Sequence, residues 1–240
     1  MSSLTQSNDL SDDTRAGAAR RLDTADPVLF DLDGTLTASG PGILASVRYA
    51  LTALGEAVPD PDVLGGFVGP PLLDSFQRLC GLTEVRARAA VAAYRESYVA
   101  RGQFQNSVYD GIPELLMQLR EAGRTLAVAT SKAEVYAVSI LEHFGLAIFF
   151  DAVVGTELDG LHTTKAEVIA QALVRLDRSA ANAVMVGDRS HDVVGALARG
   201  MPCVGALWGY GSADELTGAG AVALADWPAG LGSLLGVSGS

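Results

Sequence analysis

Five short apolar runs recur along this chain of 240 residues, and their spacing constrains the fold more than any other feature. Each holds four or five apolar residues; the first is VLFDLD, which follows Pro27, and the others cover 125–131, 150–155, 182–188 and 202–208. Continuous apolar runs of this length are typical of strands that are buried on both faces of a parallel sheet. The pattern therefore predicts a parallel sheet that is covered by helices.

Helical patterns fill the intervals between these runs. They cover 113–122, 132–144, 164–176 and 190–199, and three of them end at a glycine. Regular alternation of strands and helices predicts right-handed βαβ units. The expected fold is an α/β, Rossmann-like open parallel sheet.

Residues 38–106 interrupt this alternation. They contain helical patterns such as GILASVRYALTAL and EVRARAAVAAYRESYVA, but no convincing buried strand. We therefore predict a helical insertion over 38–106 in a core made of 26–37 and 107–240. The polar residues 1–25 are predicted to form a flexible tail.

Charge and composition exclude several classes of protein. The net charge is −11, from 28 acidic and 17 basic residues, and this sign argues against nucleic acid as a partner. No apolar run approaches the roughly 18 residues that a membrane span needs, so no membrane partner is expected. Two cysteines, Cys80 and Cys203, are too few for a disulfide framework and are expected as core residues. These features predict a cytoplasmic protein.

Two carboxylates follow the first run, in the segment FDLDGTL. Because residues two apart in an extended chain face the same side, Asp31 and Asp33 should project together from the end of the strand. Gly34 then allows a sharp turn. Two carboxylates at one point need a cation or a proton between them. The alternative to a functional site is that this segment is only a solvated turn, as an isolated D-x-D-G sequence often is.

A second acidic pair follows the run at 182–188, in the segment GDRSHD. Asp188 and Asp192 are four apart, a spacing that places both on one face of a helix. Helix capping by Asp188 and compensation of the helix dipole by Asp192 are the structural alternatives. Ligands bind beyond the carboxyl ends of strands in open α/β sheets, and oxygen ligands favour Mg²⁺ there.

The lysines are scarce, and both follow predicted strands. The chain has fifteen arginines but only Lys132 and Lys165. Lys165 begins a predicted helix, where a cation opposes the helix dipole, so a bound anion would explain it better. Thr130 and Ser131 precede Lys132; Thr130 either caps a helix or contributes with Ser131 to a phosphate cradle.

Other kinds of phosphate and metal site lack their motifs. The chain has no Gly-Lys dipeptide of a Walker A loop and no G-x-S-x-G nucleophile segment. The histidines show no metal-ligand spacing. His162 and His191 adjoin the predicted site loops and are expected to be exposed.

Together the segments FDLDGTL, ATSK (129–132), Lys165 and GDRSHD resemble the four motifs of the haloacid dehalogenase (HAD) superfamily, in the same order. The helical insertion resembles the C1 cap of its phosphoglycolate-phosphatase-like branch. The tail, GDRSHD and WGYG (208–211) also resemble actinobacterial PtkA-type protein tyrosine kinases.

The resemblance implies a Mg²⁺-dependent phosphoric monoester hydrolase that acts on a small phosphorylated metabolite such as phosphoglycolate or a nucleotide. It implies that Asp31 is the nucleophile, that Asp33 is the general acid and base, and that Thr130 and Lys165 assist catalysis. The implied phosphate ligands are Gly34, Thr130, Ser131 and Lys165. The implied metal ligands are Asp31, Asp33, Asp188 and Asp192. The alternative is a phosphotransferase with a protein phosphotyrosine partner.

Overall fold

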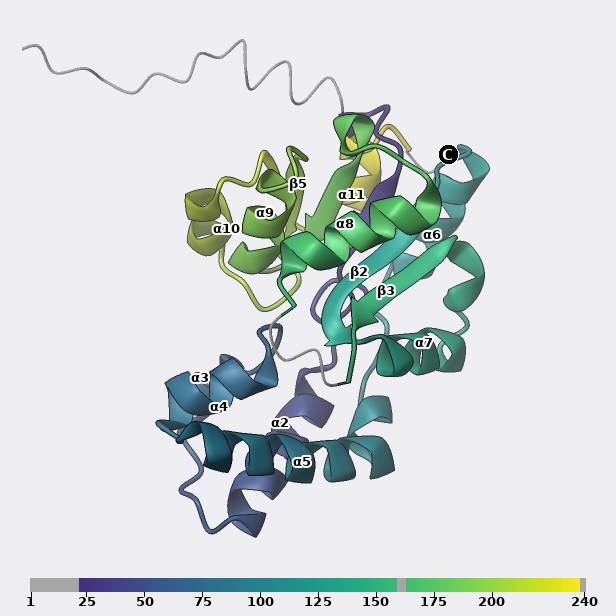
Figure 1. Cartoon of the computed structure of the whole chain (residues 1–240). Coiled ribbons are helices and arrows are strands. Elements are labelled where there is room, and N and C mark those ends of the chain that lie inside the picture. The colour runs from purple at the N-terminus through teal and green to yellow at the C-terminus, as the bar shows by residue number, and fades with distance from the viewer. Residues whose placement is uncertain (1–21, 159–162, 238–240) are drawn as a thin grey trace, which may run out of the picture.

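The computed structural model describes residues 22–158 and 163–237, and its core is one parallel sheet (Figure 1). The strand order is β3-β2-β1-β4-β5-β6. The predicted α/β class is confirmed. The strands are β1 (Val28–Phe30), β2 (Leu126–Ala133), β3 (Ala152–Thr156), β4 (Val184–Gly187), β5 (Cys203–Ala206) and β6 (Ala223–Ala225). The sequence pattern did not predict β6, which has only three residues.

Strand β2 is longer than the sequence pattern predicts. The predicted run ended at residue 131, but pairing with β3 continues to Ala133, which lies opposite Thr156 after a register shift. The next helix, α7 (Glu134–His143), therefore begins two residues later than predicted. As a result, Thr130 lies in the strand and does not cap the helix; the helix cap position is Ala133.

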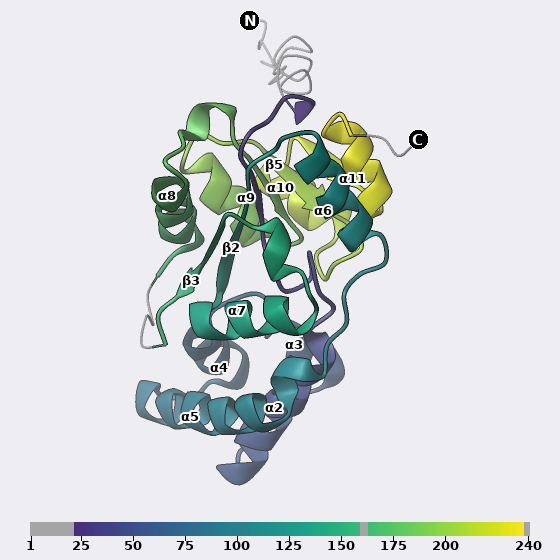
Figure 2. The same cartoon turned by 90° about the vertical axis from the view of Figure 1, so that its right-hand side faces the viewer.

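Helices cover both faces of the sheet because side chains alternate along each strand. In β1, Val28 and Phe30 pack into one apolar cluster and Leu29 packs into another. The first face carries α6 (Ile112–Glu121), α7 and α11 (Pro228–Leu234), and the second carries α8 (Lys165–Leu176), α9 (Ser190–Leu197) and α10 (Ala213–Ala219). Figure 2 shows α8 on the side of the sheet opposite to α6 and α11.

Four further helices lie together beyond the carboxyl ends of β2 and β3 (Figure 1). They have an apolar core of their own, which includes Phe67, Phe76 and Tyr98. We call this unit the cap. Its helices are α2 (Gly40–Ala53), α3 (Pro61–Gly65), α4 (Leu72–Cys80) and α5 (Glu84–Ala100), followed by a short 3₁₀ helix at Gly102–Phe104. Two further 3₁₀ helices, at Ala147–Phe149 and Ala180–Asn182, follow α7 and α8 along the chain.

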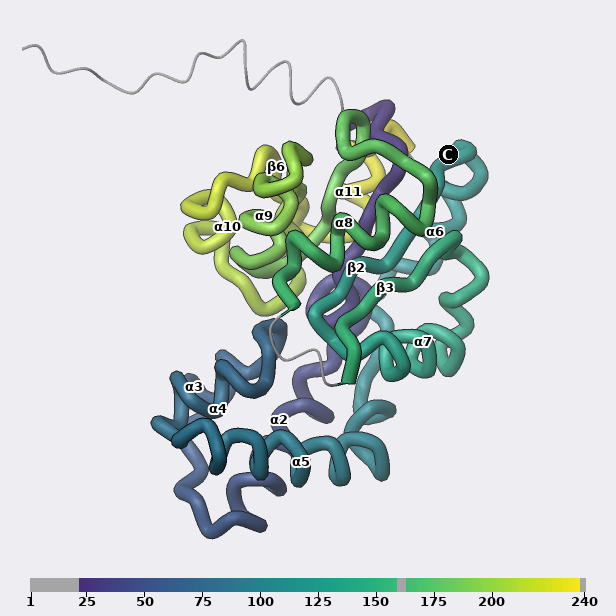
Figure 3. The backbone as a smooth tube through the Cα atoms, viewed as in Figure 1, coloured from purple at the N-terminus to yellow at the C-terminus, as the bar shows by residue number. Residues whose placement is uncertain are grey.

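Two passages of chain connect the cap to the sheet, as the tube in Figure 3 shows. They run side by side, because the Ala38 N–H donates to the Ser107 carbonyl at 2.8 Å and the Tyr109 N–H donates to the Leu36 carbonyl at 3.2 Å. This paired hinge leads directly into the loop that follows β1.

Three expectations from composition concern membrane spans, cysteines and the N-terminal tail. Within the described residues, no helix has the length and apolar character to cross a membrane. Of the two free cysteines, Cys203 is buried as expected, whereas Cys80 is only partly buried. Residues 1–21 of the predicted tail lie outside the described part of the chain.

Candidate active site

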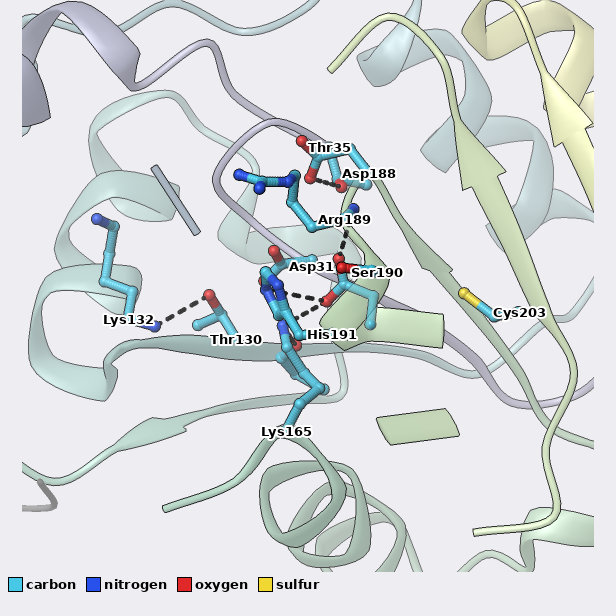
Figure 4. A network of polar contacts seen from close by, with 12 residues as sticks. Asp31, Thr35, Thr130, Lys132, Lys165, Asp188, Arg189, Ser190, His191 and Cys203 are labelled. Carbon is cyan, nitrogen blue, oxygen red and sulfur yellow. Dashed lines mark hydrogen bonds and ion pairs between the residues drawn. The ribbon is translucent and has the colours of Figure 1, made fainter. Parts of the chain in front are cut away.

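The three central strands bring the predicted site residues together. Because β1 pairs with both β2 and β4, their carboxyl ends are adjacent. Asp31 follows β1, Thr130 lies near the end of β2, and Asp188 follows β4. Figure 4 shows these side chains around one small region, with Lys165 rising toward it from α8.

The ammonium group of Lys165 is the centre of this region. Its Nζ lies 2.8 Å from Oδ1 of Asp31 and 2.8 Å from Oδ1 of Asp192. It also donates to the Ala129 carbonyl at 3.1 Å. The lysine begins α8, which is held by a capping box between Thr164 and Glu167. Lys165 is buried, so its charge balances carboxylates rather than facing water.

Burial and charge affect the two carboxylates of this ion-pair network differently. Burial raises the pKa of Asp31, and nearby Asp192 raises it further, although Lys165 opposes both effects. For Asp192, burial alone would raise the pKa, but Lys165 outweighs it and lowers the pKa below the ordinary value. Asp192 also accepts a hydrogen bond of 3.1 Å from the Arg189 N–H. Asp192 is therefore an anchored anion.

Asp188 is fully buried and lacks such a counterion among the described residues. Its Oδ1 accepts a hydrogen bond from Thr35 Oγ1 at 3.2 Å, and its Oδ2 accepts one from the Tyr210 N–H at 2.8 Å. Burial raises its pKa well above the usual range, and the charges of Asp192 and Asp31 add to this rise. Asp188 lies in the loop before α9, and it does not share a helix with Asp192 as the sequence spacing suggested.

The absence of a side chain at Gly34 leaves room for the Asp188 carboxyl group. The φ of Gly34 is +85°, a conformation that side chains disfavour, and a Cβ atom built there would lie 2.2 Å from Oδ2 of Asp188. Gly209 approaches from the other side, where a Cβ atom would lie 2.3 Å from Cβ of Asp188. The predicted role of Gly34 in phosphate binding stays a prediction.

The segment WGYG, noted in the sequence without a predicted role, closes over the loop after β1. Trp208 donates from Nε1 to the Thr35 carbonyl at 2.9 Å, and Tyr210 donates its backbone N–H to Asp188. Neither residue was predicted as part of the site. The aromatic and glycine composition of the segment was the only available signal, because the contacts are with distant parts of the chain.

Asp33 is held by the other lysine. Lys132 Nζ lies 2.8 Å from Oδ2 of Asp33, and both side chains are less than 10% exposed, at 6% and 8%. Sequence reasoning noted Lys132 after a strand but did not assign it to the site. Its scarcity and its place after β2 were the signals that could have identified it.

Thr130 and Ser131 lie beside this pair. Thr130 is buried, and its Oγ1 accepts a hydrogen bond of 3.2 Å from the Lys132 N–H. The Ser131 carbonyl accepts one of 3.3 Å from Thr156 Oγ1. Both residues lie at the carboxyl end of β2, where phosphate contact is possible, and their predicted roles stay predictions.

The expectation for His191 was wrong. It was predicted to be exposed in a loop, but it lies in the first turn of α9 and is partly buried. Its nearest carboxylate contact places Nε2 3.8 Å from Oδ1 of Asp192. Helix α9 begins at Ser190, as the pattern over 190–199 predicted, so His191 lies inside the helix with its ring toward Asp192. His162 lies outside the described residues.

Among the described residues, one group of three side chains lies close enough together to hold a metal ion. Asp31, His191 and Asp192 each offer one ligand atom within 4.8 Å of the others. However, the Lys165 ammonium already lies between Asp31 and Asp192. Asp188 instead is a buried carboxyl group without a counterion among the described residues, and burial, Asp192 and Asp31 raise its pKa. The carboxylate oxygens of Asp31 and Asp188 are donors of the kind that fit a hard cation such as Mg²⁺.

A cavity separates this site from the cap. Its lining combines core residues, among them Asp33, Ser131 and Lys132, with cap residues such as Tyr94, Tyr98 and Pro70. Apolar and aromatic side chains dominate the cap side. The cavity therefore offers room for a ligand between Asp33 and the cap.

An α/β core with buried acids at adjacent strand ends, a lysine that anchors them and a cap over the site defines a capped hydrolase of the phosphate-handling type. The model of the haloacid dehalogenase-like hydrolases matches residues 28–206. The chain belongs to this family and is a hydrolase.

Three similar proteins illustrate the range of the family. The chain is 48% identical over 189 residues to a protein of Pseudomonas aeruginosa named 5'-nucleotidase, with 79% of this chain and 86% of the relative covered. It is 50% identical over 187 residues to the tyrosine-protein kinase PtkA of Mycobacterium tuberculosis, covering 78% of this chain but only 64% of that relative. A structure described as a predicted phosphatase from Clostridium acetobutylicum has a TM-score of 0.80 at 47% identity and covers 83% and 93% of the two chains.

Proposed function

We propose that this protein is a Mg²⁺-dependent phosphatase that forms an aspartyl-phosphate on Asp31. The observation that carries this proposal is the position of the Asp31 carboxylate, which is buried beyond the central strand with Lys165 2.8 Å from Oδ1. A carboxylate in this setting is fixed in one orientation and sheltered from water, as an attacking nucleophile requires.

The reaction has two steps. In the first, an oxygen of Asp31 forms a bond to phosphorus while the bond from phosphorus to the leaving oxygen breaks, and Asp33 gives that oxygen a proton. In the second, Asp33 takes a proton from water as the water oxygen attacks phosphorus, and the bond to Asp31 breaks. Division of one displacement into two lowers each barrier, and acid–base assistance is typically worth about 10²–10⁴-fold.

The remaining charged and polar groups hold the phosphoryl group and the cation. Lys165, Thr130 and the Ser131 amide offset the negative charge on the phosphoryl oxygens. The Asp31 and Asp188 carboxylates and the Asp33 carbonyl would hold Mg²⁺, with Asp192 in support through Lys165. When bound, the cation polarises the phosphoryl oxygens and lowers the repulsion between the two anions.

The substrate that this site fits best is a small phosphate monoester. We put nucleoside monophosphates first among the candidates, because the 48% identical relative is named 5'-nucleotidase, and phosphoglycolate belongs in the same screen. The apolar cap side of the cavity agrees with a leaving group that has an apolar face.

The test compares Asp31→Asn with Asp74→Asn, a control in an exposed part of α4. Release of inorganic phosphate from p-nitrophenyl phosphate and from nucleoside monophosphates is measured with and without Mg²⁺. We expect loss of activity in the first variant only. Activity of Asp31→Asn close to that of the unaltered protein contradicts the proposal.

A second candidate function is transfer of phosphate to protein tyrosine, because the 50% identical relative bears the name of a tyrosine kinase. Incubation with ATP labelled at the γ-phosphate separates the two functions. Label that moves to protein tyrosine supports the transferase, whereas label that is released as inorganic phosphate supports the phosphatase.

A further inference from the structure

The carboxylate of Asp33 is unevenly satisfied. Its Oδ2 lies 2.8 Å from Lys132 Nζ, whereas its buried Oδ1 has no hydrogen-bond partner in the described part of the chain. A buried polar atom without a partner costs free energy unless something else uses it. The oxygen that Lys132 leaves open is therefore the one available to a ligand.

Lys132 is fixed from its backbone. It lies in the last part of β2, and its N–H donates to Thr130 Oγ1 at 3.2 Å. A lysine side chain is flexible, but it has few conformations left when its backbone N–H and its ammonium group are both bound. The side chain therefore presents its ammonium group to Asp33 from a rigid element.

The cap holds the other side of the same ammonium group. Nζ lies 4.7 Å from the ring centroid of Tyr98, a distance at which a cation is attracted to the aromatic face. Tyr98 stacks on Tyr94 with centroids 5.3 Å apart, and both belong to cap helix α5. Tyr136 of α7 meets the Tyr98 ring edge-on at 5.6 Å. Lys132 thus contacts Asp33 of the core and Tyr98 of the cap at the same time.

Lys132 and Asp33 both line the cavity between cap and core. An ion pair at this place lies where the leaving group of a substrate bound at Asp31 would depart.

We propose that Lys132 is a positioning residue: its ammonium group holds Oδ2 of Asp33 so that Oδ1, which carries the proton that Asp33 gives in the first step, faces the leaving oxygen, and the Tyr98 ring of the cap keeps Lys132 in that position. The inference rests on the proposed role of Asp33 in proton transfer. It adds that the cap contributes to catalysis through this contact and not only by covering the site.

The experiment measures kcat and KM of Lys132→Met and Lys132→Arg on two substrates. An alkyl phosphate such as glycerol 2-phosphate needs a proton on its leaving oxygen, whereas p-nitrophenyl phosphate needs little help. We expect Lys132→Met to lower kcat/KM, which reports formation of the phosphoenzyme, by about 10²-fold on the alkyl phosphate and by less than about 10-fold on the aryl phosphate. Hydrolysis of the phosphoenzyme also uses Asp33 and is common to both substrates, so kcat should fall with both. Lys132→Arg should restore part of the loss, because it keeps the charge.

Two further comparisons separate positioning from a structural effect. The double variant combines Lys132→Met with Asp33→Asn. If Lys132 acts only through Asp33, this variant should be no slower than Asp33→Asn alone, because the carboxylate that Lys132 positions is already absent. Tyr98→Leu leaves the ion pair and removes the ring, so it should give a smaller loss with the same substrate dependence. Arg88→Met, which breaks an exposed ion pair on the same helix, is the control.

The outcomes distinguish this inference from the proposed function. Equal losses of kcat/KM on both substrates, a rise in KM with unchanged kcat, or additive losses in the double variant overturn the positioning role. If Asp33→Asn itself keeps full activity on the alkyl phosphate, the proposed function fails instead. Circular dichroism of each variant shows that it is folded, and Tyr98→Leu supplies the test if Lys132→Met does not fold.

Discussion

The phenolic oxygen of Tyr210 accepts a hydrogen bond of 2.7 Å from the backbone N–H of Gly40, the first residue of cap helix α2. Tyr210 also donates its backbone N–H to Asp188 in the core. Tyr109, which lies in the second passage of the hinge, also shares a side-chain hydrogen bond with the Tyr210 phenol. One side chain therefore connects both hinge passages to the loop that holds a buried acid.

Tyr210→Phe removes these phenolic contacts and keeps the ring. Each hydrogen bond that is lost costs about 1 kcal/mol, so the free energy of unfolding should fall by about 1–2 kcal/mol. KM should also rise, because the start of α2 is less firmly held. Urea denaturation and steady-state kinetics measure both effects. Tyr49→Phe, on the exposed side of α2, is the control, and equal stability of the two variants contradicts the prediction.

Lys165→Met removes the cation that Asp31 and Asp192 share. The two carboxylates stay buried without their partner, and loss of one member of a buried ion pair typically costs about 3–5 kcal/mol. We expect a marked fall in melting temperature and no phosphoenzyme by mass spectrometry. Arg175→Met breaks an exposed ion pair with Glu134 and should cost less than about 1 kcal/mol. A Lys165→Met protein as stable as this control would falsify the central role of the ammonium group.

The sequence predicted which acidic residues lie at the site better than it predicted which side chains they contact. Asp31 and Asp188 could be placed because each follows an apolar run, and the ends of parallel strands meet at one edge of the sheet. The pairing of Lys132 with Asp33 could not be predicted, because it depends on the two extra residues that extend β2 and on a turn around Gly34. The approach of Tyr210 to Gly40 depends on packing between segments that are distant in sequence.

Asp188→Asn should make the protein without metal more stable. The raised pKa of Asp188 means that the folded protein disfavours its charged form, which the unfolded chain carries freely at neutral pH. A neutral amide removes this cost, and each kcal/mol gained corresponds to about 2–4 °C in melting temperature. Differential scanning calorimetry with EDTA should show the rise, and addition of Mg²⁺ should stabilise the unaltered protein but not the variant. A lower melting temperature in EDTA contradicts this assignment of charge.

Mg²⁺ affinity should weaken as the pH falls. Because the pKa of Asp188 is raised by burial and by Asp192 and Asp31, its carboxylate takes up a proton at a higher pH than an ordinary aspartate. The cation must then displace that proton, so the apparent dissociation constant should rise by up to about tenfold per pH unit below the raised pKa. Isothermal titration calorimetry of Mg²⁺ binding from neutral to mildly acidic pH measures this slope, and a constant affinity across that range contradicts it.

Gly34→Ala separates backbone strain from a clash at the metal-binding carboxylate. Gly34 and Gly123 both have a positive φ, of +85° and +77°, and alanine in that conformation costs about 1–2 kcal/mol at either position. A Cβ atom at Gly123 meets nothing within 4 Å, whereas one at Gly34 would lie 2.2 Å from Oδ2 of Asp188. Gly34→Ala must therefore displace that carboxylate as well, which should abolish Mg²⁺ binding and hydrolysis, while Gly123→Ala loses stability and keeps both. Calorimetric Mg²⁺ titration of the two variants decides the matter, because normal Mg²⁺ affinity in Gly34→Ala would mean that Asp188 does not hold the ion.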